Sequence, residues 1–400
     1  MPAMIDPLIP AIADADFTPT VLRARWSLDP DIHFLNHGSF GATPRVVQAA
    51  QQRWRDTMEQ QPVRFMLDRL PPALDAARAA LAGFTGAALA NLVLVENATA
   101  GANAVLHSLD WRAGERIVIA NHAYPAVRHL VRHVAARFGL VVVEAAVPWP
   151  LSHAGDLTDA YVRALRGGAR LLIVDHVFSP LAVETPLAEI LAAARAQGTR
   201  VLIDGAHAPG LLPLDLEALA AQGMDWYTGN GHKWLCAPKG AGFLYATPAA
   251  QRGLHPAVIS NDYGEGFVRE FGWTGTGDFT ARLCVPESIA FLQALGVARY
   301  RQKLRALAAE ATACLADAWK VSPGAPLAMC PAMVTLPLPG DEAGTAAAAV
   351  RWRRRLLDEY RVEVPLHAIG GRLWVRLSAQ VYNELADYQA LARAVMAMQT

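Results

Sequence analysis

Six short apolar segments recur through the middle of the chain, separated by segments with the periodicity of amphipathic helices. They span residues 92–96, 116–120, 140–145, 170–175, 200–204 and 242–246. Most are apolar on both faces, as strands of a parallel sheet are when helices cover both sides. We expect helices between several of them, for example over residues 126–139 and 187–198, and Gly198 suits the position just after a helix end. This alternation predicts an α/β fold with a mostly parallel sheet between helices.

The pattern changes after about residue 284. A helix is predicted over residues 297–319, and the segments that follow it predict two strands and two further helices: strands 333–339 and 373–379, a helix over 346–360, and a final helix at the end of the chain. With 400 residues, two domains are expected. We predict an N-terminal arm (1–35), a large domain (36–283) and a smaller α+β domain (284–400), with a long loop over 260–278 between the two.

The charge balance and the cysteines narrow the class of protein. Lys plus Arg and Asp plus Glu both number 36, so no overall field attracts nucleic acid or an anionic membrane. No apolar run reaches the length of a membrane span, and the N-terminal segment lacks the basic start of a signal peptide. The four cysteines form no C-x-x-C pair, so we expect thiols in a reducing compartment, the cytoplasm.

Two polar motifs follow apolar segments of the predicted sheet. IDGAH places Asp204 at the carboxyl end of a strand, the edge where open α/β sheets bind ligands. GNGHKW places Lys233 in a loop of small and polar residues. Pyridoxal 5′-phosphate (PLP) needs this pair, because a buried carboxylate keeps its pyridine nitrogen protonated and a lysine amine forms an imine with its aldehyde. Alone, Asp204 could cap a helix and Lys233 could be a surface lysine; together they predict a PLP site.

Two further motifs place polar or aromatic side chains at the same sheet edge. ENATAGANAV (residues 96–105) reads as a strand end, a turn and a helix start that could bind phosphate, with Thr99 adding a hydroxyl; a plain helix cap is the alternative. NHAYPAV places His122 and Tyr124 after segment 116–120, where one ring could stack on the pyridine and the other group could move a proton. Aromatic core packing is the alternative for both.

Arg376 lies within an apolar strand near the C-terminus. An unpaired guanidinium is costly to bury, and its fork of N–H groups matches a carboxylate. We therefore predict that Arg376 binds a ligand carboxylate, with an internal ion pair as the alternative.

Four motifs together, HFLNHGSFGATPRVV, ENATAGANAV, DGAHAPG and YTGNGHKWLCAPKGAGFLY, resemble the isopenicillin N epimerase-like branch of the class V aminotransferase family. The resemblance runs from about residue 33 to residue 388. It implies the fold-type I architecture of PLP enzymes, with a seven-stranded sheet in the large domain. It also implies a small amino-acid substrate and a homodimer with shared active sites.

The resemblance assigns roles around the cofactor ring. Lys233 would form the imine, Asp204 would pair with the pyridine nitrogen, and His207 would hydrogen-bond the 3-oxygen. His122 would stack on the ring and Tyr124 would move protons, although these two roles are interchangeable.

The resemblance also assigns residues to the phosphate and to the substrate. The phosphate would be held by Thr99, Ala100, Asn230 and His232, and by Thr276 reaching across from the partner subunit. The substrate would be bound by Arg376 through its carboxylate, with a mouth lined by Asn36 and His37.

Several reactions stay open for such a site. Epimerisation or racemisation at the α-carbon comes first, with Lys233 on one face and Tyr124 or His122 on the other. β-Elimination by a C–S lyase comes second and transamination third; cysteine desulfuration and a non-catalytic PLP-binding protein are disfavoured. No metal is expected, because His129 and His133 share a helix face without a third ligand.

Overall fold

The computed structural model describes residues 9–399, and a seven-stranded sheet forms its centre. The strand order is β2-β8-β7-β6-β5-β3-β4. Every neighbouring pair is parallel except those of β8, which runs antiparallel to β2 and β7. The bounds are β2 Leu92–Val95, β3 Arg116–Ala120, β4 Val141–Ala145, β5 Leu171–Asp175, β6 Arg200–Gly205, β7 Trp226–Asn230 and β8 Gly242–Ala246. The predicted α/β fold with a mostly parallel sheet is confirmed.

The six predicted apolar segments all form strands, with ends that differ by at most a residue or so. The prediction missed β7, whose last residues Gly229 and Asn230 are typical of turns. In the sheet, β7 lies between β6 and β8 and is buried along its whole length, so pairing on both sides outweighs this local preference.

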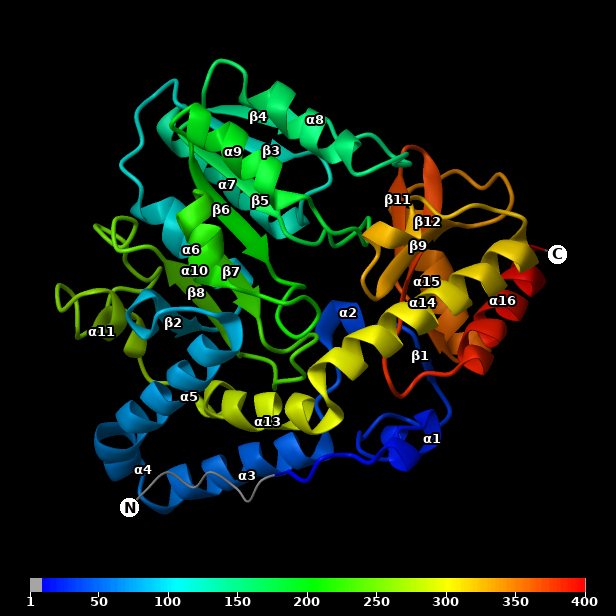
Figure 1. Ribbon diagram of the computed structural model, residues 1–400, viewed down its shortest axis with the longest axis horizontal. Helices are drawn as coiled ribbons and strands as arrows, with labels where there is room; N and C mark the ends of the chain where they lie inside the picture. The colour runs from blue at the N-terminus through cyan, green and yellow to red at the C-terminus, as the bar shows by residue number, and fades with distance from the viewer. Residues whose placement is uncertain (1–8, 400) are drawn as a thin grey trace.

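Helices cover both faces of this sheet (Figure 1). On one face α6 packs against α7, β7 and β8; on the other α8 packs against α9, and α9 packs against β6 and α10. Beside β2, α5 packs against the strand and against α13. The bounds are α3 Arg45–Gln60, α5 Leu70–Thr85, α6 Ala98–Ser108, α7 Pro125–Phe138, α8 Gly155–Leu165, α9 Leu187–Ala196, α10 Leu216–Gln222 and α13 Val285–Leu295. Gly198, with a φ of +64°, follows the end of α9 as predicted.

A second, antiparallel sheet of order β11-β12-β9 lies to the right in Figure 1, with two helices packed against it and a third packed on those helices. The helices predicted over 297–319 and 346–360 form with those bounds. A short parallel pair, β1 with β10, joins the N-terminal part of the chain to this region. The bounds are β1 His33–Phe34, β9 Met333–Pro337, β10 Val362–Glu363, β11 Leu366–Ile369, β12 Arg372–Ser378, α14 Val297–Trp319, α15 Ala346–Tyr360 and α16 Leu385–Gln399.

Shorter elements complete the described chain. They are α1 Pro19–Arg23, α2 His37–Phe40, α4 Pro62–Arg64, α11 Phe267–Gly272, α12 Thr280–Leu283, a π-helical turn Phe65–Arg69 and 3-10 turns Asp14–Asp16, Leu89–Asn91 and Leu327–Met329. The predicted loop over 260–278 therefore contains one short helix, α11.

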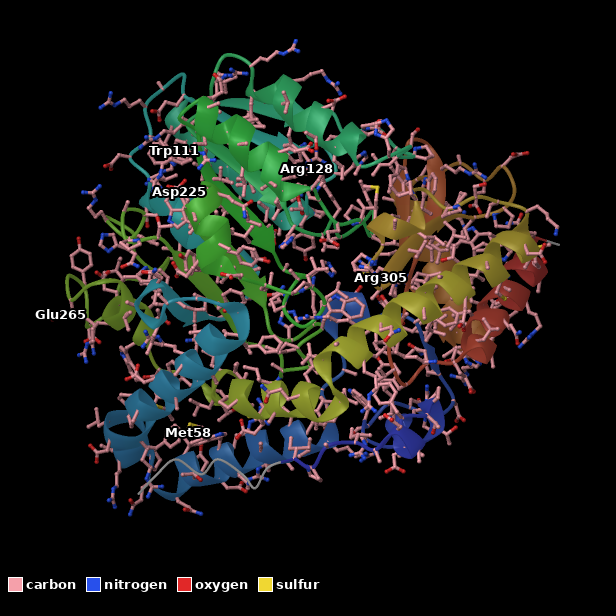
Figure 2. The ribbon with its side chains drawn as sticks, viewed as in Figure 1. Met58, Trp111, Arg128, Asp225, Glu265 and Arg305 are labelled. Atoms are coloured by element: carbon pink, nitrogen blue, oxygen red, sulfur yellow. The ribbon has the colours of Figure 1, made fainter. Side chains whose placement is uncertain are left out.

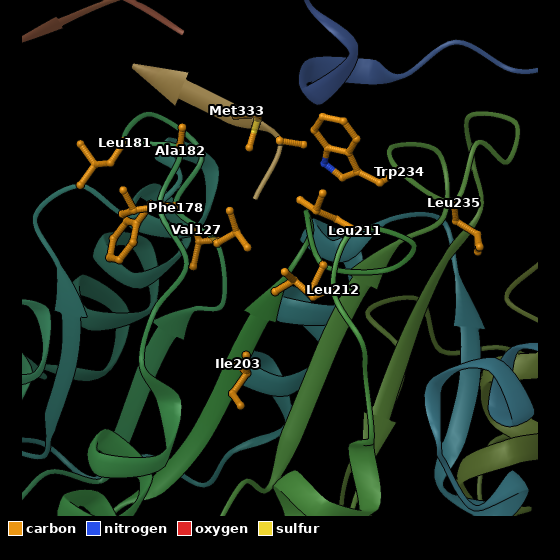
Figure 3. Close-up of a cluster of buried hydrophobic side chains, with 14 of the residues drawn as sticks. Val127, Phe178, Leu181, Ala182, Ile203, Leu211, Leu212, Trp234, Leu235 and Met333 are labelled. Atoms are coloured by element: carbon orange, nitrogen blue, oxygen red, sulfur yellow. The ribbon is translucent and has the colours of Figure 1, made fainter. Parts of the chain in front are cut away.

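Apolar packing is continuous between the two sheets (Figure 3). Trp234 and Leu211, beyond the strands of the large sheet, lie near Met333 of β9.

The predicted domain boundaries remain a prediction. The first eight residues of the predicted arm lie outside the described residues, and α13 packs on α3 and α5 although it follows the predicted boundary at 283.

Long charged side chains project from the outside of the molecule (Figure 2). Two labelled residues make surface ion pairs: Arg128 Nη2 lies 2.8 Å from Glu144 Oε1, and Asp225 Oδ1 lies 3.0 Å from Arg200 Nε. Such pairs contribute about 0–1 kcal/mol each.

Within residues 9–399, no single helix has both the length and the hydropathy to cross a membrane. One pair of helical segments, 280–295 and 297–319, meets both criteria when the two are taken together, but they are strongly bent relative to each other.

Candidate active site

A cavity of about 430 Å³ lies at the carboxyl ends of the parallel strands β5, β6 and β7, and side chains at the ends of these strands line it. The N-terminus of α6 and residues of α2, β11 and β12 close its other sides. Its polar lining consists of Ser39, Glu96, Asn97, Thr99, Tyr124, Asp175, Ser179, Asp204, His207, Asn230, His232, Lys233, Lys239, His367 and Arg376. Of the thirteen site residues predicted from the sequence, eight line this cavity and five lie behind or outside its wall.

Lys233 lies in the loop after β7, only 7% exposed, with its amine in the cavity wall. Burial, with a smaller effect of Arg376, lowers its pKa from 10.5 to about 7. The Nζ atom lies 3.0 Å from Nε2 of His207, and Trp234 Nε1 donates to Nδ1 of the same ring at 3.4 Å. Because an indole N–H can only donate, Nδ1 accepts and Nε2 carries the proton. His207 therefore donates to an unprotonated Lys233 amine, which is the nucleophilic form.

His37 lies behind Lys233 and is fully buried, outside the cavity wall. Its Nε2 donates to the Lys233 carbonyl at 3.0 Å, and its Nδ1 accepts from the Tyr382 hydroxyl at 2.8 Å. Burial lowers the pKa of His37 to about 3, so the ring stays neutral. His37 was predicted at the substrate mouth; the structure instead places it where it positions the Lys233 backbone. The backbone around Gly41 packs closely against the backbone of the loop that carries Lys233. A Cβ on Gly41 (φ +67°) would lie 2.1 Å from the His232 carbonyl oxygen.

Asp204 and Asp175 lie side by side on β6 and β5, paired in register. Both are buried and both line the cavity. Burial raises the pKa of each carboxyl, and for Asp175 the neighbouring Asp204 raises it further, well above the ordinary value. The sequence reasoning selected Asp204 and missed Asp175, although the same signal, an acid at the end of an apolar strand, marks both.

The N-terminus of α6 forms the end of the cavity that is suited to an anion. Asn97 Oδ1 accepts from the Ala100 N–H at 2.9 Å, and Asn230 Oδ1 accepts from the Ala98 N–H at 2.8 Å. Thr99 and His232 line the wall beside them, and the His232 Nδ1 has no partner among residues 9–399. Burial lowers the pKa of His232 to about 4. A helix N-terminus with hydroxyl and imidazole groups is a phosphate-binding arrangement.

Two residues predicted to hold the phosphate lie away from this cavity. Ala100 borders a separate, smaller hollow together with Thr274 and Arg282. Thr276 is exposed and outside the cavity wall, so its predicted contact with a partner subunit stays a prediction. Lys239, which lines the cavity near His232, was not predicted.

Arg376 on β12 is 2% exposed and has no acidic partner within the described chain. Nη1 donates to the carbonyl and hydroxyl of Ser179 at 2.8 and 3.0 Å, and Nη2 donates to the Ser39 hydroxyl at 2.9 Å. The Nε atom has no partner among residues 9–399, and burial lowers the pKa to about 10. Arg376 is thus a buried cation at the cavity wall, and it makes no internal ion pair with any of residues 9–399.

Asn36 supports Arg376 from behind. Its Oδ1 lies 3.5 Å from Nη2, and its amide donates to Glu363 at 3.1 Å. Asn36 was predicted to line the substrate mouth but is outside the cavity wall, where Ser39 and Ser179 lie instead. Neither serine was predicted.

The aromatic residues after β3 separate into two environments. Tyr124 lines the cavity and is 41% exposed, whereas His122 does not line it. Ring stacking and proton transfer were predicted for this pair in either order; only Tyr124 is within reach of a ligand in the cavity. His367 of β11, not predicted, also lines it, with burial and Arg376 lowering its pKa to about 3. The short strand segment that contains His367, LHAI, has no pattern that would predict a cavity-lining residue.

These residues fit PLP. An unprotonated buried amine, a buried carboxylate pair and an anion-binding helix end lie around one cavity, and an unpaired guanidinium remains for a substrate carboxylate. Within residues 9–399, no group of three or more His, Cys, Asp or Glu side chains has the arrangement of a metal site.

Comparisons with known proteins agree with this geometry. The model of the family "Aminotransferase class-V" matches residues 32–339. The chain is 35% identical to a putative L-cysteine desulfhydrase of Oryza sativa subsp. japonica, covering 90% of this chain and 82% of that protein. It is 34% identical to isopenicillin N epimerase of Streptomyces clavuligerus, covering 94% and 97%. A solved cystine C-S lyase in complex with cysteine persulfide superposes with a TM-score of 0.78 at 22% identity, covering 92% and 97%. The chain therefore belongs to the class V aminotransferase family, and it is a PLP-dependent enzyme.

Proposed function

We propose that this enzyme removes the α-proton of a small L-amino acid and eliminates the β-substituent, as a C–S lyase acting on cysteine or a small S-substituted cysteine. The observation that carries the proposal is that the Lys233 amine and the Arg376 guanidinium lie on the wall of one cavity of about 430 Å³. That volume is near the lower end for small-molecule sites, yet it must hold both cofactor and substrate. A small amino acid fits this limit better than a peptide does.

PLP, when bound, supplies an aldehyde that condenses with amines and a ring that accepts negative charge from the α-carbon. The chain's own residues supply the rest. Arg376 binds the α-carboxylate through its unpartnered Nε–H, which fixes the position of the α-carbon. Lys233, with a pKa of about 7, accepts the α-proton near neutral pH. Tyr124 donates a proton to the departing sulfur, so that the C–S bond breaks with release of a thiol, and water then hydrolyses the remaining enamine to pyruvate and ammonia.

Relatives with similar sequence identity to the chain include both L-cysteine desulfhydrases and an epimerase, which is the alternative function. An L-cysteine desulfhydrase and a probable chloroplastic L-cysteine desulfhydrase, both from Arabidopsis thaliana, share 30% and 31% identity with the chain, while the epimerase shares 34%. Epimerisation of a small amino acid is the second candidate. Lys233 and Tyr124 both line the cavity, so they would supply one proton-transfer group for each face of the α-carbon.

The decisive experiment follows both outcomes in one reaction. Purified enzyme loaded with PLP is incubated in D₂O with L-cysteine, small S-substituted cysteines and L-alanine, and pyruvate, thiol and the configuration of recovered amino acid are measured. We expect pyruvate and thiol in equal amounts from the sulfur-containing substrates. Racemised, deuterated substrate without pyruvate would reject the lyase and establish the epimerase. Lys233→Ala should abolish either reaction, and Lys303→Ala on α14, outside the cavity wall, should leave it unchanged.

The proposal extends to assembly and location. We propose a homodimer in which Thr276 reaches the neighbouring active site, tested by sedimentation of the wild type and by cofactor affinity of Thr276→Val. We also propose a cytoplasmic location. All four cysteines fall within the described residues and are free thiols, which suits a reducing compartment.

A further inference from the structure

Two carboxyl groups, one more than a pyridine nitrogen needs, lie at the floor of the cavity. β5 and β6 are neighbouring parallel strands (Figure 1). Their register pairs Asp175 directly with Asp204. Paired residues of adjacent strands point to the same face of a sheet, about 4.8 Å apart along the hydrogen-bonding direction. Both side chains are almost completely buried, at 3% and 6% exposure, and both line the cavity.

The two carboxyls differ in their partners. Asp204 Oδ1 accepts the N–H of Ala206 at 3.0 Å, so this carboxyl is oriented as an acceptor. The Asp175 carboxyl accepts the backbone N–H of Tyr124, while its Oδ2 has no partner and no contact with solvent in the described part of the chain. A buried oxygen without a donor is costly as a carboxylate, but as a protonated hydroxyl it can itself donate.

The surrounding charges do not suffice to keep both groups ionised. The titratable groups that act on Asp175 are Asp204 on β6, Lys233 after β7 and Tyr161 on α8. Lys233 is the sole cation among them, and as a base it gives up its charge near neutral pH. Two like charges in a buried site cannot both persist with so little compensation, so one carboxyl retains a proton.

We propose that Asp175 holds this proton in the cofactor-loaded enzyme and donates it in a hydrogen bond to the Asp204 carboxylate. Asp204 is then free to accept from the pyridine nitrogen of PLP, and Asp175 is a positioning residue that orients it. Each carboxyl accepts one backbone N–H, but Asp204 also faces the cationic nitrogen of the cofactor, whereas Asp175 Oδ2 has no donor among residues 9–399.

Infrared spectroscopy detects the protonated carboxyl group directly. Infrared difference spectra of the PLP-loaded enzyme in H₂O and D₂O should show the C=O stretch of a protonated carboxylic acid at neutral pH. The band should be present in the wild type and in the control Asp159→Asn, an exposed residue on α8, and absent in Asp175→Asn. A band that persists in Asp175→Asn would overturn the proposal, because the proton would then reside on another acid.

Cofactor affinity gives an independent measure. Asp175→Asn retains an N–H donor toward Asp204 and should bind PLP within about threefold of the wild type. Asp175→Ala loses the donor and should bind PLP about ten- to a hundredfold more weakly, the range for one hydrogen bond to a charged group. Equal affinity of the alanine variant and the wild type would show that Asp204 needs no donor and would also overturn the proposal. If Asp175→Ala does not fold, the infrared comparison with Asp175→Asn still decides.

Discussion

Arg376 is expected to make the ligand-free protein less stable while it makes substrate binding possible. Burial lowers its pKa from 12.5 to about 10. At 1.36 kcal/mol per pKa unit, holding the charge in this site costs about 3 kcal/mol. Replacing Arg376 with Met removes that cost and retains an unbranched apolar chain. The Ser179 carbonyl loses its donor, which costs about 1–2 kcal/mol, while the Ser39 hydroxyl keeps a partner in Asn36. We therefore expect the cofactor-free Arg376→Met protein to be about 1–2 kcal/mol more stable than the wild type.

The same substitution should weaken catalysis. One hydrogen bond from the Nε–H of a guanidinium to a carboxylate contributes about 1.5–3 kcal/mol, so kcat/KM should fall by roughly 10- to 100-fold. Urea unfolding of the cofactor-free proteins measures the first effect and substrate kinetics the second. Arg195→Met, at the exposed end of α9, is the matched control and should change stability by no more than about 0.5 kcal/mol. Destabilisation of Arg376→Met by more than about 1 kcal/mol, or an unchanged kcat/KM, would refute this reasoning.

Three further predictions concern other residues of the site. The rate of PLP uptake should rise with pH through about 7 and level off above it, because Lys233 reacts as the unprotonated amine and its pKa is about 7; a flat profile in stopped-flow absorbance would contradict this. His37→Ala should lose about 3–5 kcal/mol of stability in urea unfolding, since it leaves the Tyr382 hydroxyl and the Lys233 carbonyl unpaired beside a cavity; a loss below about 1 kcal/mol would rule out this role. Tyr124→Phe should bind PLP as the wild type does but lower the elimination rate by about 10² to 10⁴; an unchanged rate would mean that another group protonates the leaving sulfur.

The fold was predictable wherever local pattern and tertiary environment agree. β3 and β8 form over the predicted residues because their apolar runs are buried on both sides, and α14 and α15 form over theirs because their periodicity is unbroken. β7 was missed because its Gly–Asn end favours a turn when considered alone, and only its two neighbouring strands make it a strand.

The site was predictable where strand ends determine it, and not where packing of distant segments does. Asp204 lies near the end of β6 and Lys233 follows β7, and because the carboxyl ends of these neighbouring parallel strands meet, sequence order alone brings the two residues together. His37 carries the same polar ring as a ligand-binding histidine, but packing against Tyr382, 345 positions away, turns it toward the Lys233 backbone. No local pattern contains that information, and the same holds for His367, which reaches the cavity through the pairing of β11 with β12.

One physical cause connects the titratable groups of the site. Burial moves the pKa of Lys233 down and those of Asp175 and Asp204 up, so each is pushed toward its neutral form. The bound ligands bring the charges that these groups lack. A protonated pyridine nitrogen stabilises an ionised Asp204, and a substrate carboxylate compensates Arg376. Because such ligands interact with the folded chain alone, the stability of this enzyme must increase with PLP concentration, by about 2.7 kcal/mol at a hundredfold excess over the dissociation constant. A site of this kind is costly to fold when empty, and it is the cofactor and substrate that make its buried charges favourable.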